Sequence, residues 1–232
     1  MKKNNIDDGF DPELVETAQF DGDLEMPIVK DTNPELPTKV IPFSRRGESS
    51  DNNEYLIFYE HDKTFGDVVQ NPDLYIEEFR KFKGIISLDN SVFWDSPLIV
   101  QIGNVYKSRA IAHYFQTKGI NVIVNCRWGD ERSYTRCVLP EKFAFLGIPK
   151  HSVVSIGTYG CNQGKEEKYH LREGLRSMIE EVQPRCVIVY GSMPSIVFDE
   201  FKGKTRFIQF DDWTTTRKKV KDKWEQQNQE DI

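Results

Sequence analysis

The amino-acid sequence predicts an α/β protein, in which a mostly parallel sheet of about six strands is connected by crossover helices. Short apolar runs begin near positions 55, 85, 121, 152 and 186, at intervals that match one strand–helix unit. The intervening segments repeat apolar residues at helical spacing, and several end in glycine. An open doubly wound sheet and an incomplete (β/α) barrel both fit this pattern, because the body of a 232-residue chain is too short for eight such units.

The distribution of charge divides the chain into three predicted parts. Residues 1–54 hold 13 acidic and 6 basic residues and are predicted to form an acidic, largely irregular leader. Residues 55–213 are predicted to form a single α/β domain. Residues 214–232 are basic and rich in glutamine, which predicts a C-terminal helix or tail. Within the leader, Val40 to Phe43 is a candidate edge strand, because Pro42 has no N–H to donate to a neighbouring strand.

The elements of the body follow from local patterns. The predicted strands are 55–60, 85–89, 122–125, 152–156, 186–190 and 206–210. The predicted helices are 71–82, 97–118 and 165–183, and Pro184 is expected to end the last of these. Gly84, Gly119, Gly147 and Gly203 are each expected to end a helical segment in the left-handed conformation.

Two polar residues interrupt the apolar face of the 97–118 helix. Arg109 and His113 lie within that face and not opposite it. Arg109 is more than halfway along the helix, so we expect it to be a buried partner in an ion pair and not a ligand-binding group.

The loops that follow the strands carry most of the chemically active side chains, whereas the opposite strand ends carry helix stops. This asymmetry predicts a site at the carboxyl ends of the strands, where both candidate folds bind ligands. The candidates for catalysis are Asp89, Asp130 and Asp211. The candidates for ligand binding are Asn90, Trp94, Asn125, Arg127, Trp128, Tyr159, Ser192 and Trp213.

Each of these groups has a functional and a structural interpretation. Tryptophans next to carboxylates suit a base or a sugar, which stacks on the ring and bonds to the acid, but the same tryptophans can simply cover the core. Carboxylates could bind a divalent metal, or two of them could act as an acid and a base, but aspartates after strands often cap the next helix. The candidate metal ligands are Asp89, Asp130, Asp211 and Asp212.

Several other reaction types are disfavoured. The Gly157 to Lys165 loop does not match a phosphate-binding loop, because Glu166 stands where a magnesium-binding hydroxyl is required. No dinucleotide-binding glycine motif occurs. Cys126 and Cys161 follow strands, but no histidine is placed by sequence to activate either thiol. His61 is the histidine best placed for catalysis.

Composition also limits location and partners. No apolar stretch is long enough to span a membrane, and the first residues lack the apolar run of a signal peptide. We therefore expect a cytoplasmic protein without a membrane partner. A pI near 5.4 argues against a dedicated duplex-DNA binder, whereas a nucleotide, a nucleic acid or a host protein remain candidate partners.

A resemblance to a known family indicates the biological context of the protein. Six segments carry it: Ile85 to Ser91, Asn104 to Arg109, Gly119 to Asn125, Trp128 to Asp130, Ser155 to Cys161, and Val189 to Gly191. Within 84–191 the chain resembles an uncharacterised domain-of-unknown-function family of phages, plasmids and integrated bacterial elements. It departs from that family at Leu88 and at Val124, where the family typically has proline. The resemblance implies a mobile-element protein, located in the host cytoplasm if phage-encoded, and implies no settled activity.

Two hypotheses for function follow. In the first, the protein acts on or binds a nucleotide or nucleic-acid-like ligand at the strand ends. In the second, it is a non-catalytic interaction protein that binds a host or defence component through its leader and its exposed aromatic residues.

Overall fold

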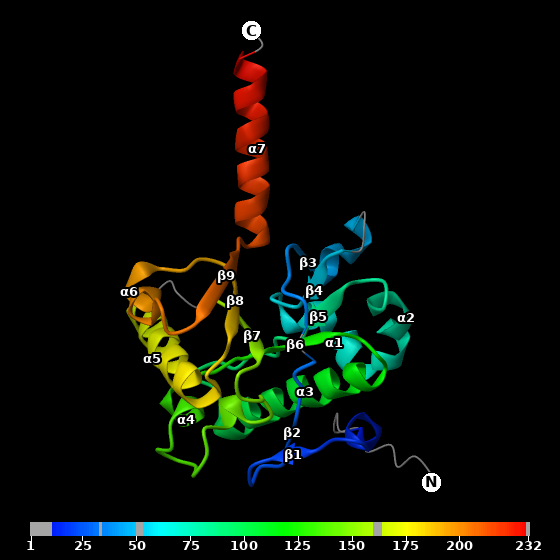
Figure 1. The fold of residues 1–232 in the computed structure, drawn as a ribbon, viewed down its shortest axis with the longest axis vertical. Helices are drawn as coiled ribbons and strands as arrows, with labels where there is room; N and C mark the ends of the chain where they lie inside the picture. The colour runs from blue at the N-terminus through cyan, green and yellow to red at the C-terminus, as the bar shows by residue number, and fades with distance from the viewer. Residues whose placement is uncertain (1–10, 33, 50–52, 160–163, 231–232) are drawn as a thin grey trace.

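The computed structural model describes residues 11–32, 34–49, 53–159 and 164–230 (Figure 1). Its central feature is a seven-stranded sheet in which all strands are parallel and pair in the order of the sequence. The strands are β3 (Val40–Pro42), β4 (Tyr55–Ile57), β5 (Gly84–Ile86), β6 (Val122–Asn125), β7 (Val153–Gly157), β8 (Cys186–Tyr190) and β9 (Arg206–Phe210). The α/β prediction is confirmed. Because the strand order never reverses, the sheet curls into a half-barrel and is not doubly wound.

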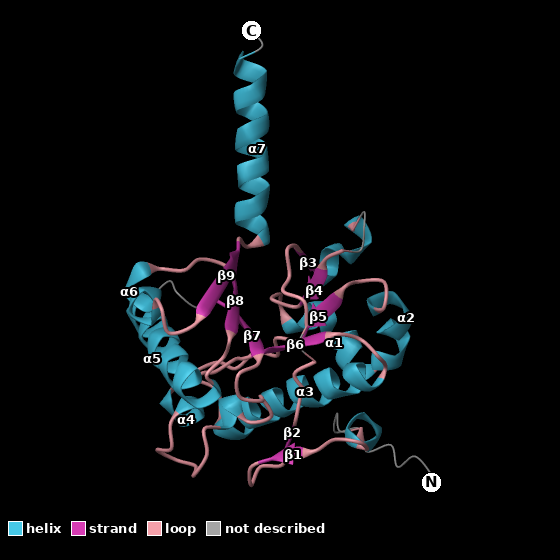
Figure 2. Cartoon of the chain, in the orientation of Figure 1, coloured by secondary structure: helices cyan, strands magenta, loops and turns pink. Residues whose placement is uncertain are grey.

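The helices are α1 (Asp62–Gln70), α2 (Ile76–Phe79), α3 (Leu98–Thr117), α4 (Glu131–Tyr134), α5 (Lys165–Val182), α6 (Ser195–Phe198) and α7 (Trp213–Glu230). Short 3₁₀ segments occupy Pro12–Val15, Phe43–Glu48, Pro72–Tyr75, Phe143–Phe145 and Asp199–Phe201. Consecutive parallel strands with right-handed crossovers place their connecting helices on one side of a sheet. Figure 2 shows α3 and α5 on the outside of the curve, and α7 projecting away from it.

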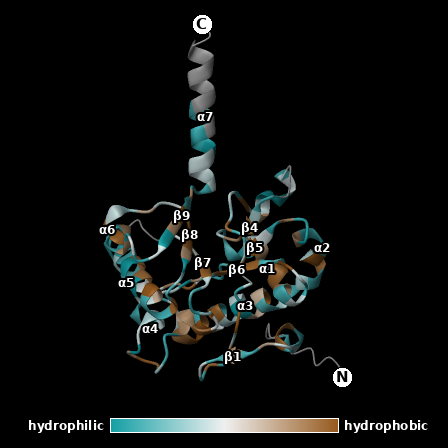
Figure 3. Ribbon diagram, in the orientation of Figure 1, coloured by the Kyte–Doolittle hydropathy of each residue, from teal (hydrophilic) through white to brown (hydrophobic). Residues whose placement is uncertain are grey.

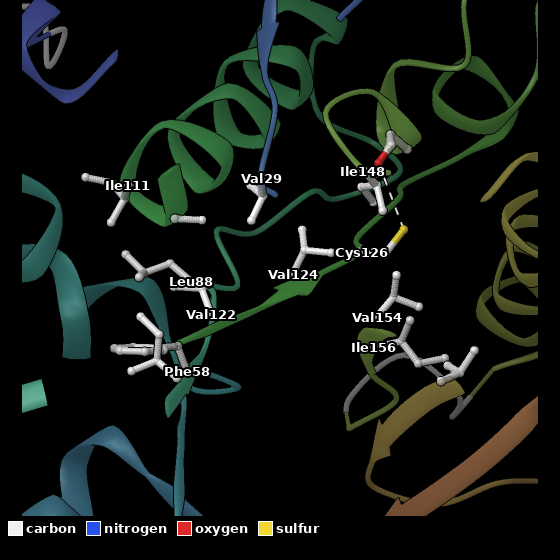
Figure 4. Close-up of a cluster of buried hydrophobic side chains, with 14 of the residues drawn as sticks. Val29, Phe58, Leu88, Ile111, Val122, Val124, Cys126, Ile148, Val154 and Ile156 are labelled. Carbon is white, nitrogen blue, oxygen red and sulfur yellow. Dashed lines mark hydrogen bonds between the residues drawn. The ribbon is translucent and has the colours of Figure 1, made fainter. Parts of the chain in front are cut away.

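Side chains on the two faces of the sheet form separate cores. The outer core lies between the sheet and the helices and includes Phe58, Leu88, Val124 and Val154 (Figure 4). The inner core fills the concave side and includes Tyr55, Ile57, Tyr59, Ile188 and Tyr190. This alternation follows from the period of two along each strand. The described part of α7 is coloured mainly hydrophilic in Figure 3, in contrast to these cores.

The predicted helix ends are confirmed at three of the four glycines. Gly119, Gly147 and Gly203 have φ values of +80°, +74° and +83°. Gly84 differs, because it is the first residue of β5 and its φ is not positive. A Cβ there would lie 2.5 Å from the ring of Tyr55 and 2.8 Å from the main-chain oxygen of Asn121, so this glycine permits close strand packing.

The N-terminal region contributes to the fold. Strands β1 (Phe20–Asp21) and β2 (Met26–Pro27) form an antiparallel pair, and the side chain of Met26 is fully buried. Strand β3 is the first strand of the sheet and pairs with β4, which confirms the predicted edge strand. The boundary at residue 54 stays a prediction, but the sheet begins before it.

Among the described residues, no helix combines the length and the apolar character needed to cross a membrane. Cys126, Cys137 and Cys186 are free thiols, of which Cys137 is exposed. Cys161 lies outside the described residues.

Candidate functional site

Four polar side chains meet at the carboxyl ends of β4 to β7. The amide nitrogen of Asn125 donates to Asp89 Oδ1 at 2.8 Å, and the hydroxyl of Tyr59 donates to Asn125 Oδ1 at 3.1 Å. The same hydroxyl lies 2.6 Å from Ser155 Oγ. All four residues are buried. We call Tyr59, Asp89, Asn125 and Ser155 the polar network; it brings together side chains from four neighbouring strands or strand ends.

Arg127 connects the polar network to the surface. Its Nη2 lies 3.3 Å from Asp89 Oδ2, and its Nη1 donates to the main-chain oxygen of Gly157 at 3.0 Å. Burial raises the pKa of Asp89, and the positive charge of Arg127 and the hydrogen bond from Asn125 oppose that rise. Burial and the nearby Asp89 also hold the pKa of Tyr59 well above its usual range, so the phenol remains protonated.

Arg127 also lines a cavity of about 240 Å³ at the ends of β6 and β7, which we call the tryptophan pocket. The full lining is Val92, Phe93, Trp94, Cys126, Arg127, Trp128, Gly129, Ile156, Gly157, Glu167, His170 and Leu171. The pocket therefore combines apolar and aromatic walls with a few charged or polar groups, which is the usual character of a small-molecule site.

The two tryptophans hold different positions in this pocket. Trp128 is buried, and its Nε1 donates to the main-chain oxygen of His170 at 3.0 Å. Its indole packs on α5 at Gly174, where a Cβ would lie only 2.1 Å from Nε1. Trp94 is 43% exposed and lies at the rim. One wall of the pocket is thus fixed by packing, and the other is accessible to solvent.

A second cavity of about 290 Å³ lies at the carboxyl ends of the outer strands, and we call it the mouth pocket. Its lining is Pro42, Ser44, Arg45, Tyr59, Glu60, His61, Thr64, Tyr159, Tyr190, Asp212, Trp213 and Thr214. The rings of Tyr59 and Tyr190 stack at 5.2 Å between centroids. The three tryptophans of the predicted site are therefore divided between two cavities, with Trp94 and Trp128 in the tryptophan pocket and Trp213 in the mouth pocket.

Asp130, Asp211 and Asp212 each have local partners in the structure. Asp130 accepts from the main-chain nitrogen of Arg132 at 3.2 Å and pairs with its guanidinium at 2.8 Å, so it caps α4. Asp211 pairs with Lys219, and Asp212 accepts from Thr215 at the start of α7. Within the described ranges, no group of three or more histidine, cysteine, aspartate or glutamate side chains is placed to hold a metal ion. Local capping and pairing therefore orient these acids separately, and a metal site formed by them stays a prediction.

The remaining candidates occupy varied positions. Asn90 is buried, and its Oδ1 has no hydrogen-bond partner within the described part of the chain. Ser192 is exposed, and its main-chain oxygen accepts from Thr158 Oγ1 at 2.7 Å. Tyr159 and His61 line the mouth pocket. Burial raises the pKa of the Cys126 thiol to about 12, so this residue is protonated at neutral pH and is a poor nucleophile.

The residues of these sites that were not among the predicted candidates include Tyr59, Ser155 and His170. Tyr59 closes the apolar run of β4, and Ser155 is a polar residue inside the apolar run of β7, which is a signal that could have identified it. His170 lies within α5, where it reaches the pocket and Tyr134 through the fold and not through any local pattern.

Comparison with known proteins places the chain in a wider group. The sequence profile of a family described as Domain of unknown function (DUF4417) matches residues 18–211. The chain is 28% identical over 148 residues to the Gene 1 protein of Mycobacterium phage L5, across 64% of this chain and 62% of that protein. It is 26% identical over 176 residues to the Gene 1 protein of Mycobacterium phage D29, across 75% and 61% respectively. The chain thus spans about three fifths of the length of these curated relatives. No solved structure matches it significantly.

Proposed function

This chain belongs to the DUF4417 family, as its resemblance over 84–191 predicted, and we propose that it binds a nucleotide-like ligand in the tryptophan pocket. The observation that carries the proposal is the presence of aromatic walls and one guanidinium in a single cavity at the strand ends. A flat ring and an anionic group on one small molecule would match these two features.

The aromatic part of the ligand is assigned to the two tryptophans. Trp128 is fixed by its bond to His170 and by packing on Gly174, so it offers a rigid apolar surface. Trp94 lies at the rim with 43% of its surface exposed, and a base that entered the pocket would cover part of that surface. A volume of about 240 Å³ lies below the range of about 300–1,000 Å³ that is usual for drug-sized ligands, which favours a mononucleotide over a dinucleotide.

The anionic part is assigned to Arg127. Asp89 and the main-chain oxygen of Gly157 hold its guanidinium in place, and a planar, oriented guanidinium suits phosphate or carboxylate. Asp89 does not line the pocket, so in this proposal it positions Arg127 and does not touch the ligand. A bound anion would repel the Asp89 carboxylate, so binding is expected to tighten as pH falls and this acid becomes protonated.

Titration with a nucleoside and with the corresponding nucleoside 5′-monophosphate tests the proposal by calorimetry. Arg127→Met is expected to weaken monophosphate binding by about tenfold or more, because a charge-assisted contact is lost, and to change nucleoside binding little. Trp94→Ala is expected to weaken both. Phe20→Ala is the control, because Phe20 on β1 is 48% exposed and does not line the pocket.

The variants separate loss of binding from loss of folding. Arg127→Met leaves Asp89 buried without its partner, so thermal unfolding must accompany its titration. Trp94→Ala truncates an exposed ring and is expected to leave folding intact. Equal binding by wild type, Trp94→Ala and Phe20→Ala, or no binding by the wild type, would overturn the proposal.

One observation favours the second candidate function, that of an interaction protein. Three exposed apolar side chains lie close together in sequence, between β5 and the first turn of α3: Phe93 is 60% exposed, Ile99 74% and Val100 46%. Exposed apolar side chains that lie together often mark a site of contact with another protein. Substitution of Ile99 and Val100 by serine would weaken capture of such a partner and leave nucleotide binding unchanged.

A further inference from the structure

We propose that α7 and the mouth pocket together bind a single strand of nucleic acid, with phosphates along the helix and one base in the pocket. This inference is independent of the tryptophan pocket. It starts from the position of α7, which leaves the end of β9 and projects away from the half-barrel (Figure 1). An isolated helix of 18 residues is marginal in water, so a partner along its length would stabilise it.

One face of α7 is positively charged. Arg217, Lys218 and Lys221 are all exposed, and their spacing of one, three and four residues places them on one side of the helix. Thr214 lies on the same side, one turn earlier, and lines the mouth pocket. We call Thr214, Arg217, Lys218 and Lys221 the basic stripe. It runs from the pocket outwards, whereas Lys219 lies on another side and pairs with Asp211.

The mouth pocket supplies surfaces for a base. Tyr159 is 56% exposed, and Trp213 forms part of the wall, with its Nε1 buried and without a hydrogen-bond partner among the residues that the structure describes. The guanidinium of Arg45 lies 5.7 Å from the centroid of the Trp213 ring. Aromatic rings next to a basic track are the combination with which proteins bind single strands, since each base offers a face for stacking.

The acids in the pocket determine which part of the strand enters it. The carboxylate of Glu60 accepts from the main-chain nitrogen of Ser44 at 2.9 Å, and that of Asp212 accepts from Thr215 Oγ1 at 2.7 Å. These negative charges disfavour a phosphate inside the pocket, so the phosphates are assigned to the basic stripe and an uncharged base to the aromatic rings. In a duplex the faces of the bases are stacked on each other, so a duplex would lose the contact between a base and the aromatic rings of the mouth pocket.

Fluorescence anisotropy of a labelled oligothymidine, titrated with the full chain at several salt concentrations, tests this inference. The triple variant R217E/K218E/K221E is expected to weaken binding at least tenfold. Each phosphate contact on a single strand contributes about −0.7 to the slope of log K against log salt, so the slope should fall in magnitude by about 2. K81E/K150E/K202E is the matched control, because it makes the same change in net charge at exposed positions on the body.

A second variant tests the pocket. Trp213→Ala is expected to weaken binding by roughly 5- to 150-fold, the effect of losing one stacked base, without changing the salt slope. If the two triple variants weaken binding equally, the basic stripe does not bind the phosphates. If duplex and single strand bind equally well, no base is bound in the mouth pocket. Absence of oligonucleotide binding would overturn both. Phe20→Ala, at a residue that lines neither pocket, should leave this titration unchanged. Binding of the nucleoside monophosphate is measured in its own titration, so the two proposals can fail separately.

Discussion

The guanidinium of Arg109 donates from Nη1 to the main-chain oxygen of Asn125 at 2.9 Å, which fastens α3 to the carboxyl end of β6. Its Nε donates to Leu146 O at 3.0 Å and its Nη2 to Ala144 O at 3.1 Å. Arg109 is 1% exposed, and burial lowers its pKa to about 10, so it remains charged at neutral pH. The predicted ion pair is not found among the described residues, where the dipoles of three carbonyl groups stabilise this charge in place of a carboxylate.

Arg109→Ala should lower the free energy of unfolding by roughly 3–5 kcal/mol, because it leaves three buried carbonyl oxygens without donors. Arg109→Lys should lower it less, since an ammonium retains the charge but cannot reach three oxygens in a planar fork. Urea denaturation measures both. Arg217→Ala on α7 is the control and should change the free energy by less than about 0.5 kcal/mol. A loss below about 1 kcal/mol in Arg109→Ala would show that the three hydrogen bonds contribute little.

Two helical glycines provide a matched test of the Trp128 wall. A Cβ on Gly103 meets no atom of the described residues within 4 Å, so Gly103→Ala should stabilise the chain by up to about 1 kcal/mol through helix propensity. A Cβ on Gly174 would lie 2.1 Å from Trp128 Nε1, so Gly174→Ala should destabilise it by about 1–3 kcal/mol. Tryptophan fluorescence should shift in Gly174→Ala alone. Similar gains in both variants would mean that the indole is free to move.

The elements that local signals specify were predictable. The helices α3 and α5 and the left-handed glycines at 119, 147 and 203 follow from periodicity and from capping over a few residues. The curl of the sheet was left open, because it depends on all the connecting helices lying on one side, and apolar spacing within one helix carries no information about its neighbours.

The candidate site was predictable only in its location. Asp130 caps the helix that begins at the next residue by accepting from Arg132 N, and capping preferences already offered that alternative. The acceptors of Arg109 lie 16, 35 and 37 residues along the chain, beyond any local pattern. No local pattern predicts the contact between Tyr59 and Ser155 either, because 96 residues separate them in the sequence. They meet because the fold brings the carboxyl ends of their strands together.

Gly147 joins the N-terminal strands to the core. Its φ is +74°, its N–H donates to Asp21 Oδ2 at 2.9 Å, and its oxygen accepts from Val29 N at 2.9 Å. A Cβ would lie 2.4 Å from the main-chain oxygen of Pro27. Gly147→Ala should therefore lower the free energy of unfolding by about 3 kcal/mol or more, through strain and collision together.

Gly119→Ala separates these two contributions. The φ of Gly119 is +80°, but no atom in the described ranges lies within 4 Å of an added Cβ. Only backbone strain therefore applies, and the loss should be about 1–2 kcal/mol. Thermal and urea unfolding of both variants measure the difference. Equal losses would show that β2 moves aside readily and that its packing against the 143–147 segment is weak.

Asp89 should make stability depend on pH. Burial raises its pKa in the folded chain above the ordinary value of 3.8, so the folded state binds more protons than the unfolded state in the interval between the two values. The free energy of unfolding then falls as pH rises through that interval. Asp89→Asn removes this titration, so the stability of the variant relative to wild type should increase with pH above about 4.

Urea denaturation of wild type and Asp89→Asn across this pH range measures that difference directly. Asp95→Asn, at an exposed position after the same strand, is the control and should run parallel to wild type. The sign of the slope of relative stability against pH shows whether burial or the charge of Arg127 has the larger effect on the pKa of Asp89. If the relative stability of Asp89→Asn fell with rising pH, the attraction of Arg127, whose Nη2 lies 3.3 Å away, would outweigh burial, and the carboxylate would be the favoured form in the folded chain.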